Sequence, residues 1–319
     1  MEKIEWIVPN IKNIDRLHQK NDFKALIYIM FYIVLLSITG GLSYYFINTG
    51  DYFLASITLF FHGTFFSFLG WSGIGHELVH YSVFKTKLLN SFFLKLFALL
   101  TWNNYVFFKE SHTKHHKYTL YDQKDREIVM PLTPEYDKWI YLFTFNIPFF
   151  YKNIKVLIEN SLGKINGIWG NELFPYEEKE KRLKLFNFAR FILIGHVVLA
   201  TLFIVFEMYP LLLLVTFAPF IGNWLNRMLA ISQHINMQGN INDFRRNSTT
   251  IRLNWFLSTL YSNMNYHIEH HLYPQVPFYN LPQLSKELDE LHFLPKPIIG
   301  LSNVIKHVTS NTKVENVNR

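Results

Sequence analysis

Four long runs without a charged residue constrain the fold of this chain more than any other feature. Residues 25–50 and 52–75 contain no Asp, Glu, Lys or Arg, and the runs 191–206 and 208–226 are separated only by Glu207. A transmembrane helix needs about 20 predominantly apolar residues to cross a bilayer core of about 30 Å. The sequence therefore predicts an all-α integral membrane protein with four transmembrane helices in two hairpins, over residues 25–75 and 190–230.

The distribution of basic residues predicts the orientation of these helices. The two connecting turns, Asn48–Tyr52 and Glu207–Pro210, contain no Lys or Arg. The positive-inside rule then places both termini and the central region in the cytoplasm. The expected cytoplasmic parts are an arm (1–24), a central cytoplasmic or interfacial region (76–189) and a C-terminal region (231–319). Within the central region, the apolar patches 89–107 and 139–150 are too broken or too short to cross a bilayer, so they predict interfacial or re-entrant helices.

Composition excludes several classes of protein. Half of the residues are hydrophobic and only 17% are charged, against about 25% in an average soluble protein. The chain has no cysteine, which excludes disulfides, zinc fingers, thiolate-bound clusters and cysteine nucleophiles. The net charge of +7 then belongs to the cytoplasmic face, where it favours anionic lipid headgroups or an acidic soluble partner over nucleic acid.

Histidines form the one pattern that points to chemistry, because nine of the fourteen fall into clusters or beside them. The nine are His76 and His80 (H-x-x-x-H), His112, His115 and His116 (H-x-x-H-H), His234 alone, and His267, His270 and His271 (a second H-x-x-H-H). Residues three and four apart share one face of a helix, so each box presents its imidazoles together. Imidazole suits iron, zinc, copper and nickel, and eight or nine ligands fit two metal ions better than one.

In this pattern the chain resembles the membrane fatty acid desaturase–hydroxylase superfamily, whose members are histidine-box di-iron oxygenases. The three boxes occur in that family's order, with similar spacing and hairpin topology, over roughly residues 12–295. The stretch 263–277 (NMNYHIEHHLYPQVP) looks like bacterial members. The resemblance implies that the eight box histidines ligate two irons, and that His234 matches the place where some members supply a ninth ligand. It also implies a bacterial inner-membrane location with a cytoplasmic active site.

The resemblance further implies an O₂-dependent oxidation of an unactivated C–H bond in a fatty acyl or related lipid substrate. Desaturation is the largest class, whereas hydroxylation and oxidative decarboxylation of a fatty acid or alkane remain alternatives. The sequence has neither a dinucleotide-binding Gly-rich fingerprint nor the haem motif of a fused cytochrome, so a separate ferredoxin-, rubredoxin- or cytochrome-type electron donor is implied. That donor would dock on the basic face. Arg245-Arg246 and the cluster 179–184 are typical of a solvated or lipid-facing surface, and donor docking is the alternative role for them.

Two other functions compete with this interpretation. His76-Glu77-Leu78-Val79-His80 is also H-E-x-x-H, in which two histidines hold zinc and the glutamate is the base of a metalloprotease. This alternative leaves at least six clustered histidines unexplained, and the chain lacks the Asp-Gly that intramembrane metalloproteases carry in a late helix. A non-catalytic metal carrier or transporter is the other alternative, although transport sites usually lie near the bilayer midplane.

Two glutamates inside the boxes and two histidines in predicted membrane helices could have either a structural or a functional role. Glu77 and Glu269 lie inside boxes, where each could orient an imidazole N–H or could be an exposed or helix-pairing carboxylate. His62 and His196 fall within predicted membrane helices, where an ionisable residue is a functional hypothesis by default. For both histidines we expect a neutral ring that is hydrogen-bonded to a neighbouring helix.

Overall fold

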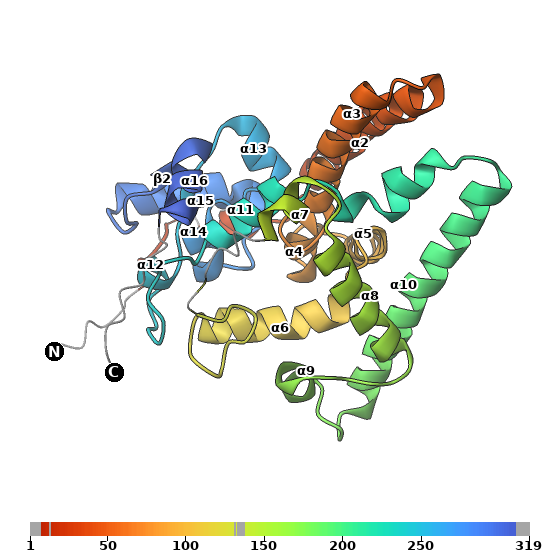
Figure 1. Cartoon of the computed structure of the whole chain (residues 1–319). Helices are drawn as coiled ribbons and strands as arrows, with labels where there is room; N and C mark the ends of the chain where they lie inside the picture. Colours follow the sequence, from red (N-terminus) through yellow and green to blue (C-terminus); the bar gives the residue numbers. More distant parts are fainter. Residues whose placement is uncertain (1–7, 13, 131, 133–137, 311–319) are drawn as a thin grey trace.

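The computed structural model describes residues 8–12, 14–130, 132 and 138–310, and these residues are mostly helical (Figure 1). The elements are α1 (Ile14–Leu17), α2 (Asp22–Thr49), α3 (Tyr52–Phe66), η1 (Ser67–Leu69), α4 (Ile74–Val79), α5 (Lys87–Leu100), α6 (Tyr105–Tyr118), α7 (Trp139–Phe143), α8 (Ile147–Ser161), α9 (Ile168–Leu173), α10 (Lys179–Val205), η3 (Leu212–Thr216), η4 (Ala218–Phe220), α11 (Trp224–Ser232), α12 (Phe244–Asn247), β1 (Ile251–Arg252), α13 (Trp255–Leu260), α14 (His267–Leu272), η5 (Phe278–Asn280), α15 (Leu281–Glu290), β2 (Ile298–Ile299) and α16 (Leu301–Thr309).

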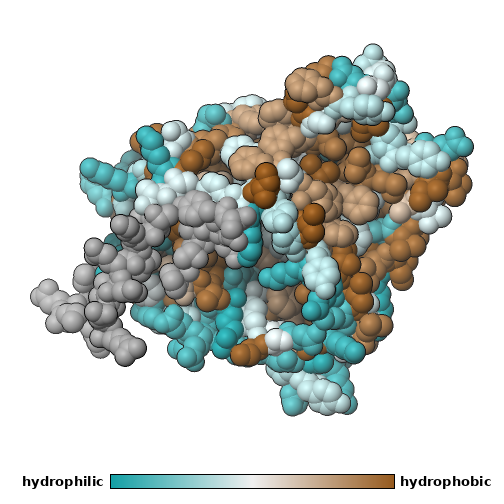
Figure 2. All heavy atoms as spheres, viewed as in Figure 1, coloured by the Kyte–Doolittle hydropathy of each residue, from teal (hydrophilic) through white to brown (hydrophobic). Residues whose placement is uncertain are grey.

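Three segments are long and apolar enough to cross a membrane. They are α2, the segment Tyr52–Val79, which comprises α3, η1 and α4, and α10. The helices α2 and α3 project together as a hairpin, and α10 runs apart from them on the other side of α5 (Figure 1). Figure 2 shows apolar residues gathered over this part of the molecule, whereas polar residues gather at its opposite end. The structure therefore agrees with a helical membrane protein.

Local capping explains where the hairpin of α2 and α3 begins and turns. The Asn21 side chain accepts a hydrogen bond from the backbone N–H of Lys24 at the start of α2. Gly50 ends the helix with φ 81°, a left-handed conformation that glycine adopts without a Cβ clash. The Asp51 carboxylate then accepts from the N–H of Leu54 and starts α3. These caps satisfy backbone groups that the helix ends would leave unpaired.

The expected fourth continuous membrane helix is not found over 208–226. The chain there forms a π-helical turn (η3), a 3-10 turn (η4) and an extended residue, Ile221, before α11 begins. Pro219 cannot donate a backbone hydrogen bond, so it interrupts a regular helix. Hydropathy alone could not reveal this break, because every piece of the segment is apolar.

The extended segment passes close to α3 at Gly63. A Cβ at this glycine would lie 2.3 Å from the carbonyl oxygen of Ile221, so a larger residue would force the two apart. Ile221 also forms an antiparallel bridge with Phe145 in the connection between α7 and α8. The broken segment is thus fixed between α3 and the central region.

The two apolar patches of the central region form parts of several short helices. Residues 89–107 comprise most of α5, a turn at Trp102 with φ 57°, and the first turn of α6. Residues 139–150 comprise α7 and the start of α8. Neither patch forms a spanning helix, which agrees with the expectation from sequence.

The remaining helices form a cap around one end of the long helices. Tyr32 of α2 donates a hydrogen bond to the carbonyl of Leu260 at 2.7 Å, and its hydroxyl lies 2.8 Å from that of Ser262. The Asp22 carboxylate accepts from the backbone N–H groups of Lys85 and Thr86. In addition, β1 and β2 pair in parallel, with Ile251 opposite Ile298. The contacts of Tyr32 and Asp22 attach the cap to α2, and the strand pair lies within the cap.

Candidate metal centre

All nine histidines singled out from the sequence lie together in the cap, in two groups. The five-histidine cluster consists of His76, His80, His112, His116 and His270. The four-histidine cluster consists of His115, His234, His267 and His271. Within each cluster the potential ligand atoms all lie within 4.8 Å of one another, so each group could hold a metal ion.

Helix geometry divides the H-x-x-H-H boxes between the two clusters. On α6, His112 and His116 are four residues apart and share a face, whereas His115 turns toward the other cluster. On α14, His267 and His271 share a face and His270 turns away. Each H-x-x-H-H box therefore supplies potential ligands to both clusters, so the two clusters share α6 and α14. His76 lies in α4, His80 follows it, and His234 follows α11.

The inner ring nitrogens of neighbouring histidines face one another at short distances. In the five-histidine cluster, His116 Nε2 lies 2.9 Å from His112 Nε2 and 3.1 Å from His270 Nε2. In the four-histidine cluster, His267 Nε2 lies 2.9 Å from His234 Nε2 and 3.0 Å from His271 Nε2. The Nε2 atoms of His76 and His80 are buried with no hydrogen-bond partner.

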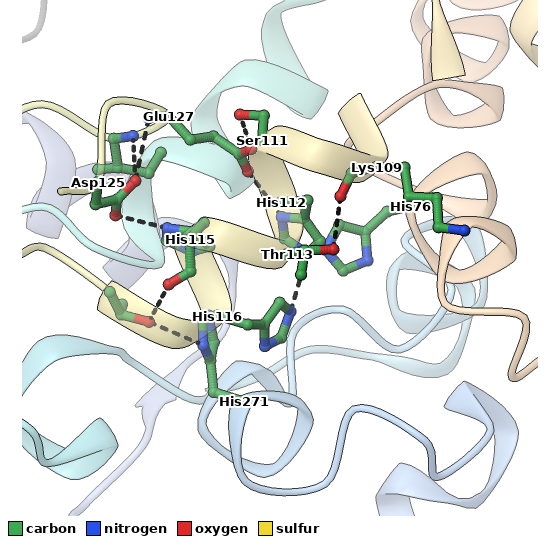
Figure 3. A network of polar contacts seen from close by, with 12 residues as sticks. His76, Lys109, Ser111, His112, Thr113, His115, His116, Asp125, Glu127 and His271 are labelled. Atoms are coloured by element: carbon green, nitrogen blue, oxygen red, sulfur yellow. Dashed lines mark hydrogen bonds and ion pairs between the residues drawn. The ribbon is translucent and has the colours of Figure 1, made fainter. Parts of the chain in front are cut away.

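The outer ring nitrogens of five histidines meet hydrogen-bond acceptors. The pairs are His76 with Glu77 at 2.9 Å, His112 with Glu127 at 2.7 Å, His115 with Asp125 at 2.8 Å, His234 with the carbonyl of Asn247 at 2.9 Å, and His271 with the hydroxyl of Thr119 at 3.3 Å. Figure 3 shows Asp125 and Glu127 reaching the histidines of α6 from the loop that follows this helix. Such acceptors fix the tautomer and orientation of metal-binding histidines.

These hydrogen bonds test whether the site fits metal ions. A histidine that donates from Nδ1 keeps an unprotonated Nε2 lone pair, as His234 and His271 must here. Lone pairs directed into a shared space repel one another unless a proton or a metal ion lies between them. Two nitrogens about 2.1 Å from a cation and at right angles are about 3 Å apart, close to the distances above. The residues present therefore fit two metal ions.

Burial keeps most of these imidazoles neutral and available as ligands. It lowers the pKa of His80 to about 4 and the pKa of His234 to about 3. Burial also disfavours the charged form of His115, but the hydrogen bond and charge of Asp125 raise its pKa overall. Burial raises the pKa of Glu127 to about 7. A bound cation would be favoured by both the neutral imidazoles and the nearby carboxylates.

The two glutamates inside the boxes have different partners. Glu77 is buried, and its Oε1 lies 2.9 Å from His76 Nδ1 and 3.5 Å from His270 Nδ1. Glu269 is also buried, but it accepts hydrogen bonds from the hydroxyls of Thr250 and Ser285. Glu77 thus orients the imidazole of His76 and lies beside that of His270. Glu269 instead attaches α14 to α15 and to Thr250, the residue before β1.

The two histidines expected within membrane helices are hydrogen-bonded to neighbouring segments, as predicted. His62 Nε2 lies 2.8 Å from the carbonyl of Leu214, and its Nδ1 lies 2.9 Å from the Thr39 hydroxyl. His196 Nε2 lies 2.8 Å from the carbonyl of Leu99. Neither joins a cluster among the described residues.

Sequence reasoning missed the acceptors outside the boxes. Asp125 and Glu127 lie in a loop, ten and fifteen residues after the histidines that they contact. The available signal was the pair of carboxylates shortly after the second box. No sequence pattern indicated Thr119 or the backbone carbonyl of Asn247.

An apolar cavity of about 540 Å³ lies between α2, α3, α5 and residues 208–215. Its walls include Ile33, Leu36, Phe93, Leu96 and Leu211, and His62 is among the few polar groups that it touches. The cavity could therefore hold a flexible hydrocarbon chain.

Comparison with known proteins agrees with this geometry. The chain matches the family described as Fatty acid desaturase over residues 52–299, a range that contains both histidine clusters and most of the chain. No curated protein matches the sequence. The match extends over far more than half of the chain, so this protein belongs to the fatty acid desaturase family.

Proposed function

We propose that this protein uses two irons and O₂ to oxidise an unactivated C–H bond of a fatty acyl substrate, and that the product is an alkene. The observation that carries the proposal is the pair of histidine clusters in a chain of the fatty acid desaturase family. Neutral imidazole is a suitable ligand for iron, and the division into five and four histidines suits two ions.

The nine clustered histidines would hold the irons, which when bound would supply the O₂-dependent oxidation of the substrate. Glu77, Glu127 and Asp125 accept hydrogen bonds from three of these histidines and orient their rings. In the four-histidine cluster every member is buried, whereas His80 and His116 of the five-histidine cluster are partly exposed. We therefore expect the substrate to approach the five-histidine cluster. Burial of the remaining ligands excludes water from the reaction.

The apolar cavity supports a lipid substrate. Ligand cavities are lined mostly by apolar side chains with few polar groups, and the walls contributed by α2, α3 and α5 have this character. An acyl chain could enter from the bilayer, because α2 and α3 belong to segments long enough to span it. The polar end of the substrate would then remain near the cap.

The proposed membrane arrangement retains two hairpins with the cap and both termini on the cytoplasmic side of a bacterial inner membrane. The second hairpin would consist of α10 and the broken segment 208–226, which returns the chain to the cap without a continuous helix. Electrons would come from a separate ferredoxin-, rubredoxin- or cytochrome-type protein.

The alternatives differ in their products and in their use of Glu77. Hydroxylation or oxidative decarboxylation could occur at the same metal site, with a different placement of the substrate carbon. A zinc metalloprotease would need Glu77 free to activate water, but its carboxylate lies against His76 and His270. The protease alternative also leaves the four-histidine cluster without a role.

Mass spectrometry of lipids, free acids and volatile hydrocarbons tests this proposal. Cells that express the chain should contain a new alkene that is absent from cells expressing His270→Ala. The matched control is His292→Asn, because His292 lies outside both clusters and asparagine tolerates its left-handed φ of 51°. Product in the His270→Ala strain, or purified protein that binds no iron, would contradict the proposal. An alcohol or terminal olefin would select one of the alternative reactions.

A further inference from the structure

We propose that the outer face of α6 is the docking surface for a small acidic electron-transfer protein. We define this α6 lysine face by Lys109, Lys114, Lys117 and Lys124, of which the first three lie on α6 and the last follows it. The inference rests on the proposed di-iron function, and it names the surface through which reducing equivalents would enter.

The position of these lysines relative to the histidines is the first argument. On α6, His112, His115 and His116 face the clusters, whereas Lys114 and Lys117, two and five residues after His112, lie on the opposite face. Lys109, three residues before His112, is exposed at the flank of the histidine face. Figure 3 shows Lys109 on the same helix as these three histidines. A helix with its side chains is about 10 Å across. A protein bound to this face would thus be separated from the metal ligands by a single helix.

Uncompensated charge is the second argument. Among the described residues, none of the four lysines has an ion-pair partner. Two nearby carboxylates pair with other cations: Glu110 with Lys181 at 2.7 Å, and Glu172 with Arg126 at 3.5 Å. The charge of the α6 lysine face is therefore available to attract an acidic partner over a distance.

The two basic clusters noted in the sequence are less suitable. Lys181 lies 2.7 Å from Glu110 and 3.2 Å from Glu178, and Arg245 pairs with Asp243 at 2.7 Å. Their positive charge is partly neutralised within the protein. The structure thus favours a surface that sequence inspection did not single out, because ion pairing cannot be read from a run of basic residues.

Aromatic rings beneath the lysines are the third argument. Lys109 lies over the ring of Tyr81 at 5.6 Å, and Lys114 lies over that of Trp169 at 5.0 Å. Lys124 lies 5.4 Å from the ring of Tyr118. Tyrosine and tryptophan are enriched at protein interfaces. Partly exposed rings among lysines therefore fit a protein partner.

A lipid surface fits this face less well. An interfacial helix needs an apolar face that enters the bilayer, but the outward positions of α6 carry lysines and Thr113. By contrast, α8 exposes Tyr151, Val156 and Ile158. Electron-transfer encounters are typically small and transient, and charge complementarity mainly increases their association rate.

The test compares two triple charge reversals with equal change in net charge. The variant Lys109→Glu/Lys117→Glu/Lys124→Glu alters the α6 lysine face, and Lys152→Glu/Lys155→Glu/Lys164→Glu alters exposed lysines on and after α8. The probe is an acidic plant-type [2Fe–2S] ferredoxin. Its binding to the full-length, detergent-solubilised protein is measured by calorimetry without iron, and its rate of electron transfer to the iron-loaded protein is measured by stopped flow. Dithionite with a small mediator reduces the same samples without docking.

We expect the α6 variant to weaken ferredoxin binding and to slow electron transfer by at least about tenfold at low salt, with the α8 variant close to the unaltered protein. Dithionite should reduce all three equally. The proposal is overturned if ferredoxin does not bind, if both variants or neither lose binding, or if the α6 variant instead loses binding to phosphatidylglycerol vesicles. Failure to bind iron would overturn the proposed di-iron function, whereas the metal-free calorimetry would still decide whether this face docks an acidic protein.

Discussion

The five-histidine and four-histidine clusters use the same two helices but have different surroundings. Around the five-histidine cluster, the carboxylates of Glu77 and Glu127 accept hydrogen bonds from His76 and His112. Around the four-histidine cluster, one acceptor is a carboxylate, Asp125, and the other two are the carbonyl of Asn247 and the hydroxyl of Thr119. The first cluster thus has two carboxyl groups behind its ligands, whereas the second has one.

The two clusters also differ in the exposure of their histidines. His80 and His116 of the five-histidine cluster are partly exposed, whereas all members of the four-histidine cluster are buried. A carboxylate behind a histidine increases the basicity of that ligand. Two clusters built from repeated boxes are therefore not equivalent, because the residues outside the boxes make them different.

The largest expected effect comes from removing one ligand of either cluster. His270→Ala and His271→Ala should each lower product formation by more than about 100-fold, because loss of a ligand costs more than loss of an outer partner. Each variant should retain about one iron, bound by the intact cluster. Iron analysis and Mössbauer spectroscopy of the two variants would check this, since each should show a different remaining site. Loss of both irons in both variants would show that the clusters bind metal only as a pair.

A smaller effect is expected from Glu77→Gln. Glutamine preserves the size of the side chain but replaces the carboxyl group beside His76 and His270 with a neutral amide, which cannot ionise. Iron affinity of the five-histidine cluster should fall by about 10- to 100-fold, as is typical of outer-partner substitutions. Titration with a competing chelator measures both sites. Equal weakening of the four-histidine cluster would contradict the proposed difference between the clusters.

The sequence predicted the ligand candidates better than it predicted their arrangement. Spacing of three and four residues identified all eight box histidines, and the structure brings them together with His234. Spacing could not indicate that His115 and His116 belong to different clusters. Adjacent helical residues point about 100° apart, so the division depends on how α6 and α14 face each other.

For the fold, too, the sequence predicted local features better than contacts between residues distant in the sequence. Apolar length correctly indicated three segments able to span a membrane. Over 208–226 the chain is instead broken at Pro219 and extended at Ile221, which bridges Phe145. That bridge joins residues distant in sequence, and hydropathy contains no information about such pairing.

A modest effect is expected at the four-histidine cluster from Thr119→Val. The hydroxyl is neutral and lies 3.3 Å from His271 Nδ1, so its loss removes a weaker acceptor than a carboxylate. Iron affinity of this cluster should fall by less than about tenfold, as measured by the same chelator titration. A decrease as large as that of Glu77→Gln would mean that charge behind the ligands does not distinguish the two clusters.

The smallest effect on iron is expected from Glu269→Gln, although this residue is adjacent to His270. Its carboxylate accepts from Thr250 at 2.5 Å and from Ser285, so it anchors α14. Replacing one acceptor oxygen by an amide NH₂ leaves one hydroxyl poorly paired, which should lower the free energy of unfolding by about 1–3 kcal/mol. Thermal unfolding of the metal-free variant measures this loss, and chelator titration should show both clusters nearly unchanged. Because α14 carries ligands of both clusters, selective weakening of one cluster would mean that Glu269 acts on His270 directly, and the contrast drawn here between the two buried glutamates would fail.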